Sequence, residues 1–207
     1  MLLGKEDLSS RTPFKRSLEK TAFALCSLLA LVLLTACNDG GANGLHIKSS
    51  ATGDKDLQVK SSYAFAVTKT FTDIAGKTTT AASYRVYAAN YDLDAKNFSM
   101  TLDKPLTSDD QIRIVFSLVG DEGGHDKSPP KVGTYSAKAD KFMKVEDVAI
   151  VTRRGGSDNR VWLDRTTLNG DVKVTSASGD QMSCEVDLTS GDTEIKGSFT
   201  AKILTRK

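Results

Sequence analysis

Apolar and polar residues alternate with a period of two in the last third of the chain. Three consecutive runs, residues 172–175, 182–188 and 195–203, place an apolar side chain at every second position. This period is typical of strands with one buried and one solvated face. The turns between the runs contain Gly179 and Gly191, each followed by an aspartate, and glycine supplies the positive φ that tight hairpins need. The pattern therefore predicts an antiparallel meander of three strands.

Earlier parts of the chain repeat the period of two less regularly. The runs lie at residues 57–59, 63–67, 84–86, 98–102, 112–118, 145–152 and 161–163. Between residues 45 and 207 no stretch of ten residues has the 3.6-residue period of a helix, and the most helix-like piece, residues 137–145, is short. Nine or ten short strands separated by turns predict an all-β fold. We expect an antiparallel β-sandwich of immunoglobulin-like type, with a small up-and-down β-barrel as the alternative.

The beginning of the chain has a different pattern. An uncharged, apolar run occupies residues 21–36 and follows four basic residues, Arg11, Lys15, Arg16 and Lys20. A basic segment followed by an apolar segment is typical of a secretory signal. As a helix the run would span about 24 Å, which is short of the roughly 30 Å hydrocarbon core of a bilayer. The length therefore favours an export signal over a permanent membrane span.

The end of this run resembles the lipobox of bacterial lipoproteins. Leu34, Thr35, Ala36 and Cys37 match the four positions of that motif, a leucine, two small residues and an invariant cysteine. The resemblance implies that the signal is cleaved before Cys37 and that the Cys37 sulfur carries diacylglycerol, with further acylation of the freed amine. Two or three acyl chains hold a protein to a membrane far more firmly than one chain does.

The resemblance also divides the chain into three parts. We expect a signal peptide over residues 1–36, a lipidated cysteine with a flexible tether over residues 37–44, and a single all-β domain over residues 45–207. The tether is rich in glycine and asparagine, and it reaches about 25 Å when extended. In lipoproteins of enteric bacteria, an aspartate directly after the cysteine favours the inner membrane. This chain has Asn38 at that position. The implied location is therefore the outer membrane of a bacterial envelope.

Charge and cysteine usage change little once the signal is set aside. The formal net charge of +2 comes from residues 1–37, which hold five basic and three acidic residues and leave 23 of each in the rest of the chain. A domain without net charge has no overall electrostatic field that would attract nucleic acid, so we expect no nucleic-acid partner. Cys184 is the only cysteine after Cys37, so no internal disulfide can form. Its phase with Met182 and Val186 places it on the buried face.

Residues 120–126 form a loop rich in glycine and carboxylates. Asp121, Glu122 and Asp126 are a candidate calcium site, because Ca²⁺ is bound by several oxygen ligands. The alternative is an ordinary solvated loop built from turn-forming residues. Apart from this candidate, we expect no cofactor.

Arginines gather beside the single tryptophan. Arg153, Arg154, Arg160 and Trp162 are a candidate binding site for a sugar phosphate, a lipid head group or an acidic partner. Arginine and tryptophan are the residue types most enriched at binding hot spots. A charged turn between two strands is the alternative interpretation. Nearby, Pro129 and Pro130 predict a rigid connection into an edge strand.

Motifs of catalysis are missing from the sequence. No Gly-x-Ser-x-Gly occurs, and the two histidines, His46 and His125, cannot build a multi-histidine zinc site. We therefore expect no enzyme activity. The sequence predicts a lipid-anchored envelope protein that acts as a binding or structural module, with an envelope protein or glycan as its partner. The alternatives are an envelope hydrolase with a loop-borne carboxylate site and a calcium-stabilised adhesion domain.

Overall fold

The alternating segments form strands of one mixed sheet in the computed structural model, which describes residues 43–96 and 102–205. Described residues all belong to one compact unit, Gly41–Lys207. The strands are β1 (Gly44–Ser49), β2 (Gly53–Gln58), β3 (Ser61–Thr72), β4 (Thr78–Ala89), β5 (Ile112–Glu122), β6 (Gly133–Ser136), β7 (Lys144–Arg154), β8 (Ser157–Trp162), β9 (Asn169–Ser178), β10 (Gln181–Ser190) and β11 (Thr193–Leu204). The prediction of an all-β domain is confirmed.

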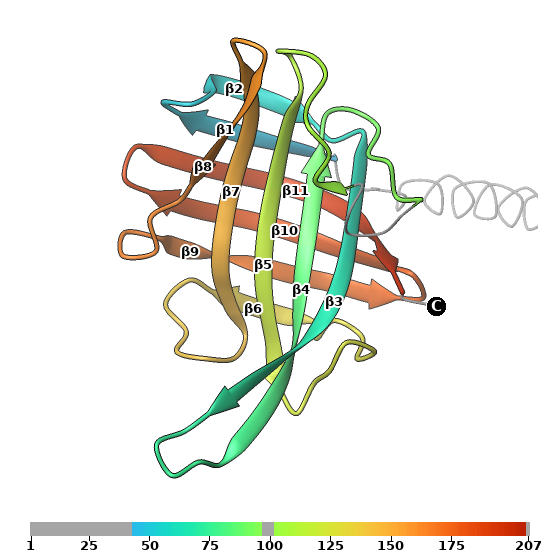
Figure 1. Ribbon diagram of the computed structural model, residues 1–207, viewed down its shortest axis with the longest axis vertical. Coiled ribbons are helices and arrows are strands. Elements are labelled where there is room, and N and C mark those ends of the chain that lie inside the picture. The colour runs from blue at the N-terminus through green and yellow to red at the C-terminus, as the bar shows by residue number, and fades with distance from the viewer. Residues whose placement is uncertain (1–42, 97–101, 206–207) are drawn as a thin grey trace, which may run out of the picture. The chain divides into compact units, whose positions relative to one another are not determined.

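Eight of these strands pair in a closed ring. The pairing order runs β10, β9, β6, β7, β5, β4, β3 and β11, and β11 also pairs with β10. Most neighbours are antiparallel, but β11 pairs with β3 and β6 pairs with β7 in parallel. In Figure 1, β3, β4, β5 and β7 form a layer that crosses steeply in front of β9, β10 and β11. The separate sheets of an immunoglobulin-like sandwich are not confirmed, and the parallel pairs depart from a purely up-and-down order.

Three strands lie outside the ring. β1 and β2 form a hairpin that extends the sheet from β11, and β8 pairs with β7. Gly197 in β11 allows β1 to approach, because a Cβ on this residue would lie 2.2 Å from the Gly44 carbonyl oxygen. Its φ of 133° is one that glycine adopts readily.

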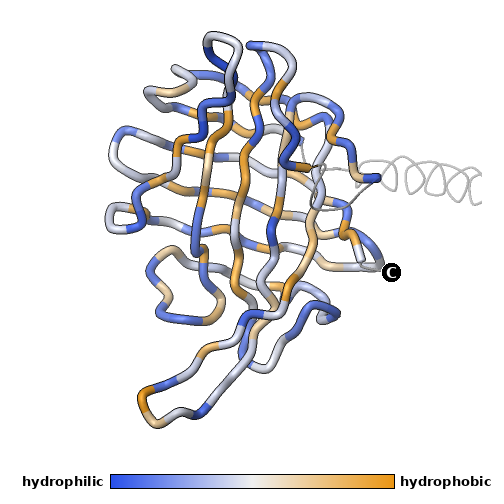
Figure 2. The backbone as a smooth tube through the Cα atoms, in the orientation of Figure 1, coloured by the Kyte–Doolittle hydropathy of each residue, from blue (hydrophilic) through white to orange (hydrophobic). Residues whose placement is uncertain are grey.

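The larger hydrophobic cluster lies between the two layers, and we call it the interior core. It draws on both layers, as shown by Phe116 of β5 and Phe199 of β11, whose stacked rings have centroids 5.7 Å apart. Hydrophobic and hydrophilic residues alternate along several strands in Figure 2, because one face of these strands points into this core. Cys184 belongs to it and is 1% exposed, which confirms its predicted burial. Burial raises the pKa of its thiol to about 12.

Several other expectations meet the structure here. β6, which follows Pro129 and Pro130, pairs on both sides with β9 and β7, so the prediction of an edge strand was wrong. Residues 137–143 contain a turn and bends, so the most helix-like piece is not a helix. The strand expected at residues 98–102 falls almost wholly outside the described residues. Leu102, its last residue, is buried and lies in no strand.

Candidate functional site

The connection between β4 and β5 covers one end of the outer face of the β3–β4–β5–β7 layer (Figure 1). Leu93, Leu102 and Leu106 from the described parts of this connection pack on the sheet. With residues of the strands they form a second hydrophobic cluster, which we call the outer cluster. Its buried members are Phe65, Tyr87, Ala89, Leu93, Leu102, Leu106, Val115, Ala149 and Val151.

Arg113 of β5 lies beneath this connection. Ile112 and Ile114 point into the interior core, so the strand alternation turns Arg113 to the outer face. Arg113 is 1% exposed, and within the described part of the chain it is the only charged residue that is buried. Its Nη1 donates to the hydroxyl of Tyr91 at 3.1 Å and to the carbonyl of Lys104 at 2.9 Å. Nε and Nη2 find no hydrogen-bond partner among the described residues.

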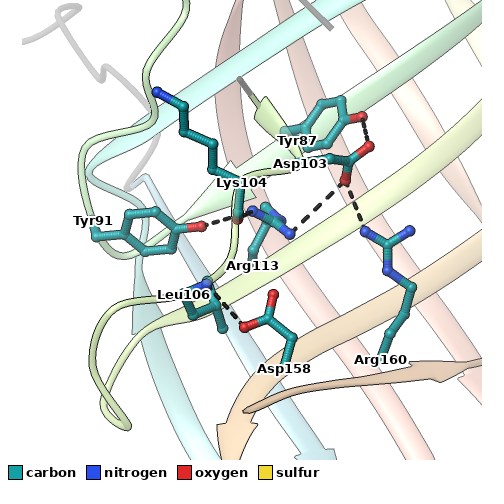
Figure 3. Close-up of polar contacts among 8 residues, drawn as sticks. All are labelled: Tyr87, Tyr91, Asp103, Lys104, Leu106, Arg113, Asp158 and Arg160. Atoms are coloured by element: carbon teal, nitrogen blue, oxygen red, sulfur yellow. Dashed lines mark hydrogen bonds and ion pairs between the residues drawn. The ribbon is translucent and has the colours of Figure 1, made fainter. Parts of the chain in front are cut away.

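Asp103 supplies the negative charge next to this buried guanidinium. One carboxylate oxygen lies 3.8 Å from Nη2 of Arg113 and accepts a 2.8 Å hydrogen bond from Nη2 of Arg160. The other oxygen accepts a 3.1 Å hydrogen bond from the hydroxyl of Tyr87. Figure 3 shows the Asp103 side chain with contacts to all three residues. A buried guanidinium is costly without a counter-charge, so Asp103 both neutralises Arg113 and fastens the connection to the sheet.

Tyr87 remains a donor to Asp103 over a wide pH range. Burial raises the pKa of Tyr87 to about 12, and the neighbouring charge of Asp103 acts in the same direction. The phenol is therefore neutral at any physiological pH and keeps the proton that it donates to the carboxylate.

Arg160 and Trp162 extend the same face to the edge strand β8. Arg160 is opposite Val151, and Trp162 is opposite Ala149, so both side chains continue the rows of Arg113 and Val115. The Arg160 guanidinium lies 5.6 Å from the centroid of the Trp162 ring, in cation–π geometry. Trp162 is 48% exposed, which is unusual for so large an apolar side chain.

The β7–β8 hairpin is tied to the connection by a further contact. Asp158 of β8 accepts a 2.9 Å hydrogen bond from the backbone N–H of Leu106 (Figure 3). Because Asp103, Asp158 and Arg160 join the connection to β8, the exposed Trp162 stands on a fixed support. We call Arg160, Trp162 and the supporting Asp103 the Trp162 surface.

The structure divides the four residues of the predicted arginine–tryptophan site. Arg160 and Trp162 are in contact, as just described. Arg153 instead donates to the carbonyl of Leu106 and has its Nε 3.6 Å from Asp109. Arg154, at the end of β7, lines a separate cavity together with Arg153.

Carboxylates of the predicted calcium loop have other partners. Asp121 lies 3.4 Å from the ammonium of Lys131, and Asp126 exchanges hydrogen bonds with the hydroxyl of Thr68. Glu122 ends strand β5 opposite Ala81. Within residues 43–96 and 102–205, no group of three or more His, Cys, Asp or Glu side chains is placed to hold a metal ion, so the structure does not bring these three together.

Residues of the lipobox, Leu34, Thr35, Ala36 and Cys37, lie outside the described residues. Among those that are described, the structure contains no helix long and apolar enough to cross a membrane.

Sequence reasoning missed Arg113, Asp103 and Tyr87. Arg113 had a visible signal, because it stands between two isoleucines in a stretch, residues 112–116, that is otherwise apolar. A buried charge in such a run indicates a partner elsewhere in the chain. Asp103 and Tyr87 had no local signal, since they meet Arg113 only through the tertiary fold.

Comparison with known proteins gives no relative for this chain: no family model, curated protein or solved structure matches it.

Proposed function

We propose that the chain is an exported, lipid-anchored envelope protein whose all-β domain acts by binding a protein or glycan through the Trp162 surface. The observation that carries the binding function is the exposed indole of Trp162, held against Arg160 on an edge strand. The anchor rests on the lipobox sequence Leu34-Thr35-Ala36-Cys37.

Rigidity is the first argument for binding at this surface. Arg160 is fixed by Asp103, and Asp103 is fixed in turn by Tyr87, so little side-chain freedom is left to lose when a partner arrives. Pre-ordered side chains lower the entropic cost of association.

Chemistry is the second argument. An indole offers a flat apolar face that can stack on a sugar ring or fill a pocket of a protein, and an arginine supplies directional hydrogen bonds. Both residue types are enriched where interface residues contribute most to affinity.

We also infer that the closed ring is flattened, so that it packs as a two-layer sandwich although its strands form one sheet. The stacking of Phe116 on Phe199 across the interior supports this arrangement. Such a body is rigid, and its edge strand β8 holds the Trp162 surface away from the interior core.

The anchor is tested by mass spectrometry of the membrane fraction from cells that express the full chain. We expect a diacylglyceryl-modified Cys37 at a new amino terminus, and we expect Cys37→Ala to leave the membrane fraction. An unmodified Cys37 inside an uncleaved chain would contradict the anchor.

Binding is tested with a glycan array and with capture from solubilised envelopes, each run on the parent chain and on Trp162→Ala. We expect Trp162→Ala to weaken binding about tenfold or more. Val132→Ala is the matched control, because Val132 is 53% exposed and lies outside the Trp162 surface. If Trp162→Ala binds as strongly as the parent chain and Val132→Ala, this surface is not the binding site.

A further inference from the structure

A polar cavity of about 280 Å³ opens at the end of the molecule where the β1–β2 and β7–β8 turns lie (Figure 1). Its lining includes Lys55 of β2, Arg153 and Arg154 of β7, and Asp109 from the connection before β5. The turn between β1 and β2 adds the hydroxyls of Ser50 and Thr52. The cavity therefore gathers cations from two separate segments, β2 and β7, and a carboxylate from a third.

Charge in this cavity is unbalanced. Three cations face one carboxylate in the lining, although residues 38–207 as a whole carry no net charge. Arg153 is held by Asp109 and by the carbonyl of Leu106, which fixes its guanidinium at the wall. The pKa of the nearby Asp110 is lowered, chiefly by a hydrogen bond from Ser108. The positive charges of Lys60 and Lys55 add to this effect.

The β1–β2 turn is ordered by its own side chains. The backbone N–H of Thr52 donates to the Ser49 hydroxyl at 3.2 Å, and the two hydroxyls lie 2.9 Å apart. Thr52 also donates to the carbonyl of Gly53 at 3.0 Å. One wall of the cavity is therefore preformed rather than assembled by a ligand.

We propose that this cavity binds the phosphoryl group of a phosphorylated ligand. Arginine and lysine together surround a tetrahedral oxyanion from several directions, and guanidinium groups match its geometry. Ser50 supplies a further donor, and the cavity is large enough to hold an organic group beside the phosphate. The Asp109 carboxylate is a hydrogen-bond acceptor that suits the hydroxyls of a sugar, which favours a sugar phosphate over inorganic phosphate.

The inference goes beyond the proposed function, because the cavity and the Trp162 surface share no residue. A phosphoryl group reaches such a cavity from two sources, a soluble sugar phosphate or the head group of a phospholipid. Both sources present the same chemistry to Lys55, Arg153 and Arg154.

Isothermal titration calorimetry on the full chain in non-ionic detergent tests the proposal. The probes are glucose 6-phosphate, inorganic phosphate, glucose, dihexanoyl phosphatidic acid and dihexanoyl phosphatidylcholine. We expect binding of the phosphate monoesters, weaker binding of inorganic phosphate and none of glucose or phosphatidylcholine. Tighter binding of glucose 6-phosphate identifies a soluble ligand, and tighter binding of the phosphatidic acid identifies a lipid head group.

Variants assign the binding to this cavity. Arg154→Gln and Lys55→Gln should each weaken binding of the tighter monoester about tenfold, and Arg154→Lys should recover part of the loss. Neither side chain takes part in a described ion pair that would have to be broken, so both variants should keep the fold. Arg85→Gln is the control, because Arg85 is an exposed arginine of β4 outside the cavity.

Two results would overturn the proposal: no heat with either monoester, or equal affinity in the parent chain, Arg154→Gln and Lys55→Gln. The Trp162→Ala variant should bind the monoester as the parent chain does. Failure at the cavity is therefore distinguishable from failure at the Trp162 surface.

Discussion

The interior core and the outer cluster lie on opposite faces of the same strands, and they are built differently. The interior core lies between the two layers, and it draws its buried hydrophobic residues from both of them. The outer cluster is closed by a connection, and a charged group, Arg113, is buried next to it. No charged residue belongs to the first cluster, whereas the second lies beside a buried charge that one carboxylate neutralises. This comparison predicts different consequences when each region is damaged.

Phe116→Ala should have the largest effect. Phe116 is fully buried in the interior core and stacks on Phe199, so the truncation removes contacts in both layers. Truncation of a buried phenylalanine costs about 3–5 kcal/mol. Urea unfolding followed by circular dichroism should show one cooperative transition at a much lower midpoint. A midpoint within the error of the parent chain would mean that the two layers do not share this core.

Asp103→Asn should have an intermediate and local effect. It removes the charge beside Arg113, and leaving a buried polar group without its partner costs about 1–3 kcal/mol. We expect faster amide hydrogen exchange at residues 102–111, because Asp103 fastens the connection to the sheet. Exchange in β10 and β11 should stay unchanged, since these strands pack in the interior core. Equal acceleration in all strands would show that the two regions unfold as one.

For each pH unit, alkaline pH should lower the free energy of unfolding less than either substitution does. Through Cys184 it acts on the interior core. Burial raises the pKa of Cys184 from its ordinary 9.0 to about 12, so the folded state favours the neutral thiol. The corresponding stability is fully present below about pH 9 and is lost as the pH rises towards about 12. The loss from one such group is at most about 1.4 kcal/mol per pH unit.

Urea midpoints measured from neutral pH upward should therefore begin to fall near pH 9 in the parent chain. In Cys184→Ala the decline should begin later, because the first group to ionise is gone. An identical onset in both proteins would contradict the assignment to Cys184.

The interior core was the predictable part of the fold. Period-two alternation in β9, β10 and β11 identified inward residues such as Val172, Cys184 and Phe199, because one face of a strand is buried and the other solvated. The glycines at 179 and 191 likewise marked hairpins, and both have a φ of 59°.

Pairing between distant strands could not be predicted in the same way. The β11–β3 contact joins residues 202–204 to 63–65, and nothing local in either segment specifies the other. Gly197 shows the same difficulty: it looked like one more inward position of β11, yet its lack of a side chain is what admits β1.

The candidate site was predictable only in part. Arg160 and Trp162 stood out by residue type, and the structure places them together. Arg153 and Arg154 were grouped with them because they are close in sequence. Arg153 shares the outer face with Arg160, but its guanidinium is bound to the Leu106 carbonyl and to Asp109. At the end of the hairpin, Arg153 and Arg154 instead line the cavity that Lys55 also lines.

The open edges of β2 and β8 have a consequence for crowding. β2 pairs only with β1, and β8 pairs only with β7, within the part of the chain that the structure describes. An open strand edge can recruit the edge of another molecule and start aggregation. β2 carries Asp54, Lys55 and Asp56 in succession, and β8 carries Asp158 and Arg160. Charges along both open edges disfavour strand addition, so copies of the chain can come close together at high concentration without joining their sheets.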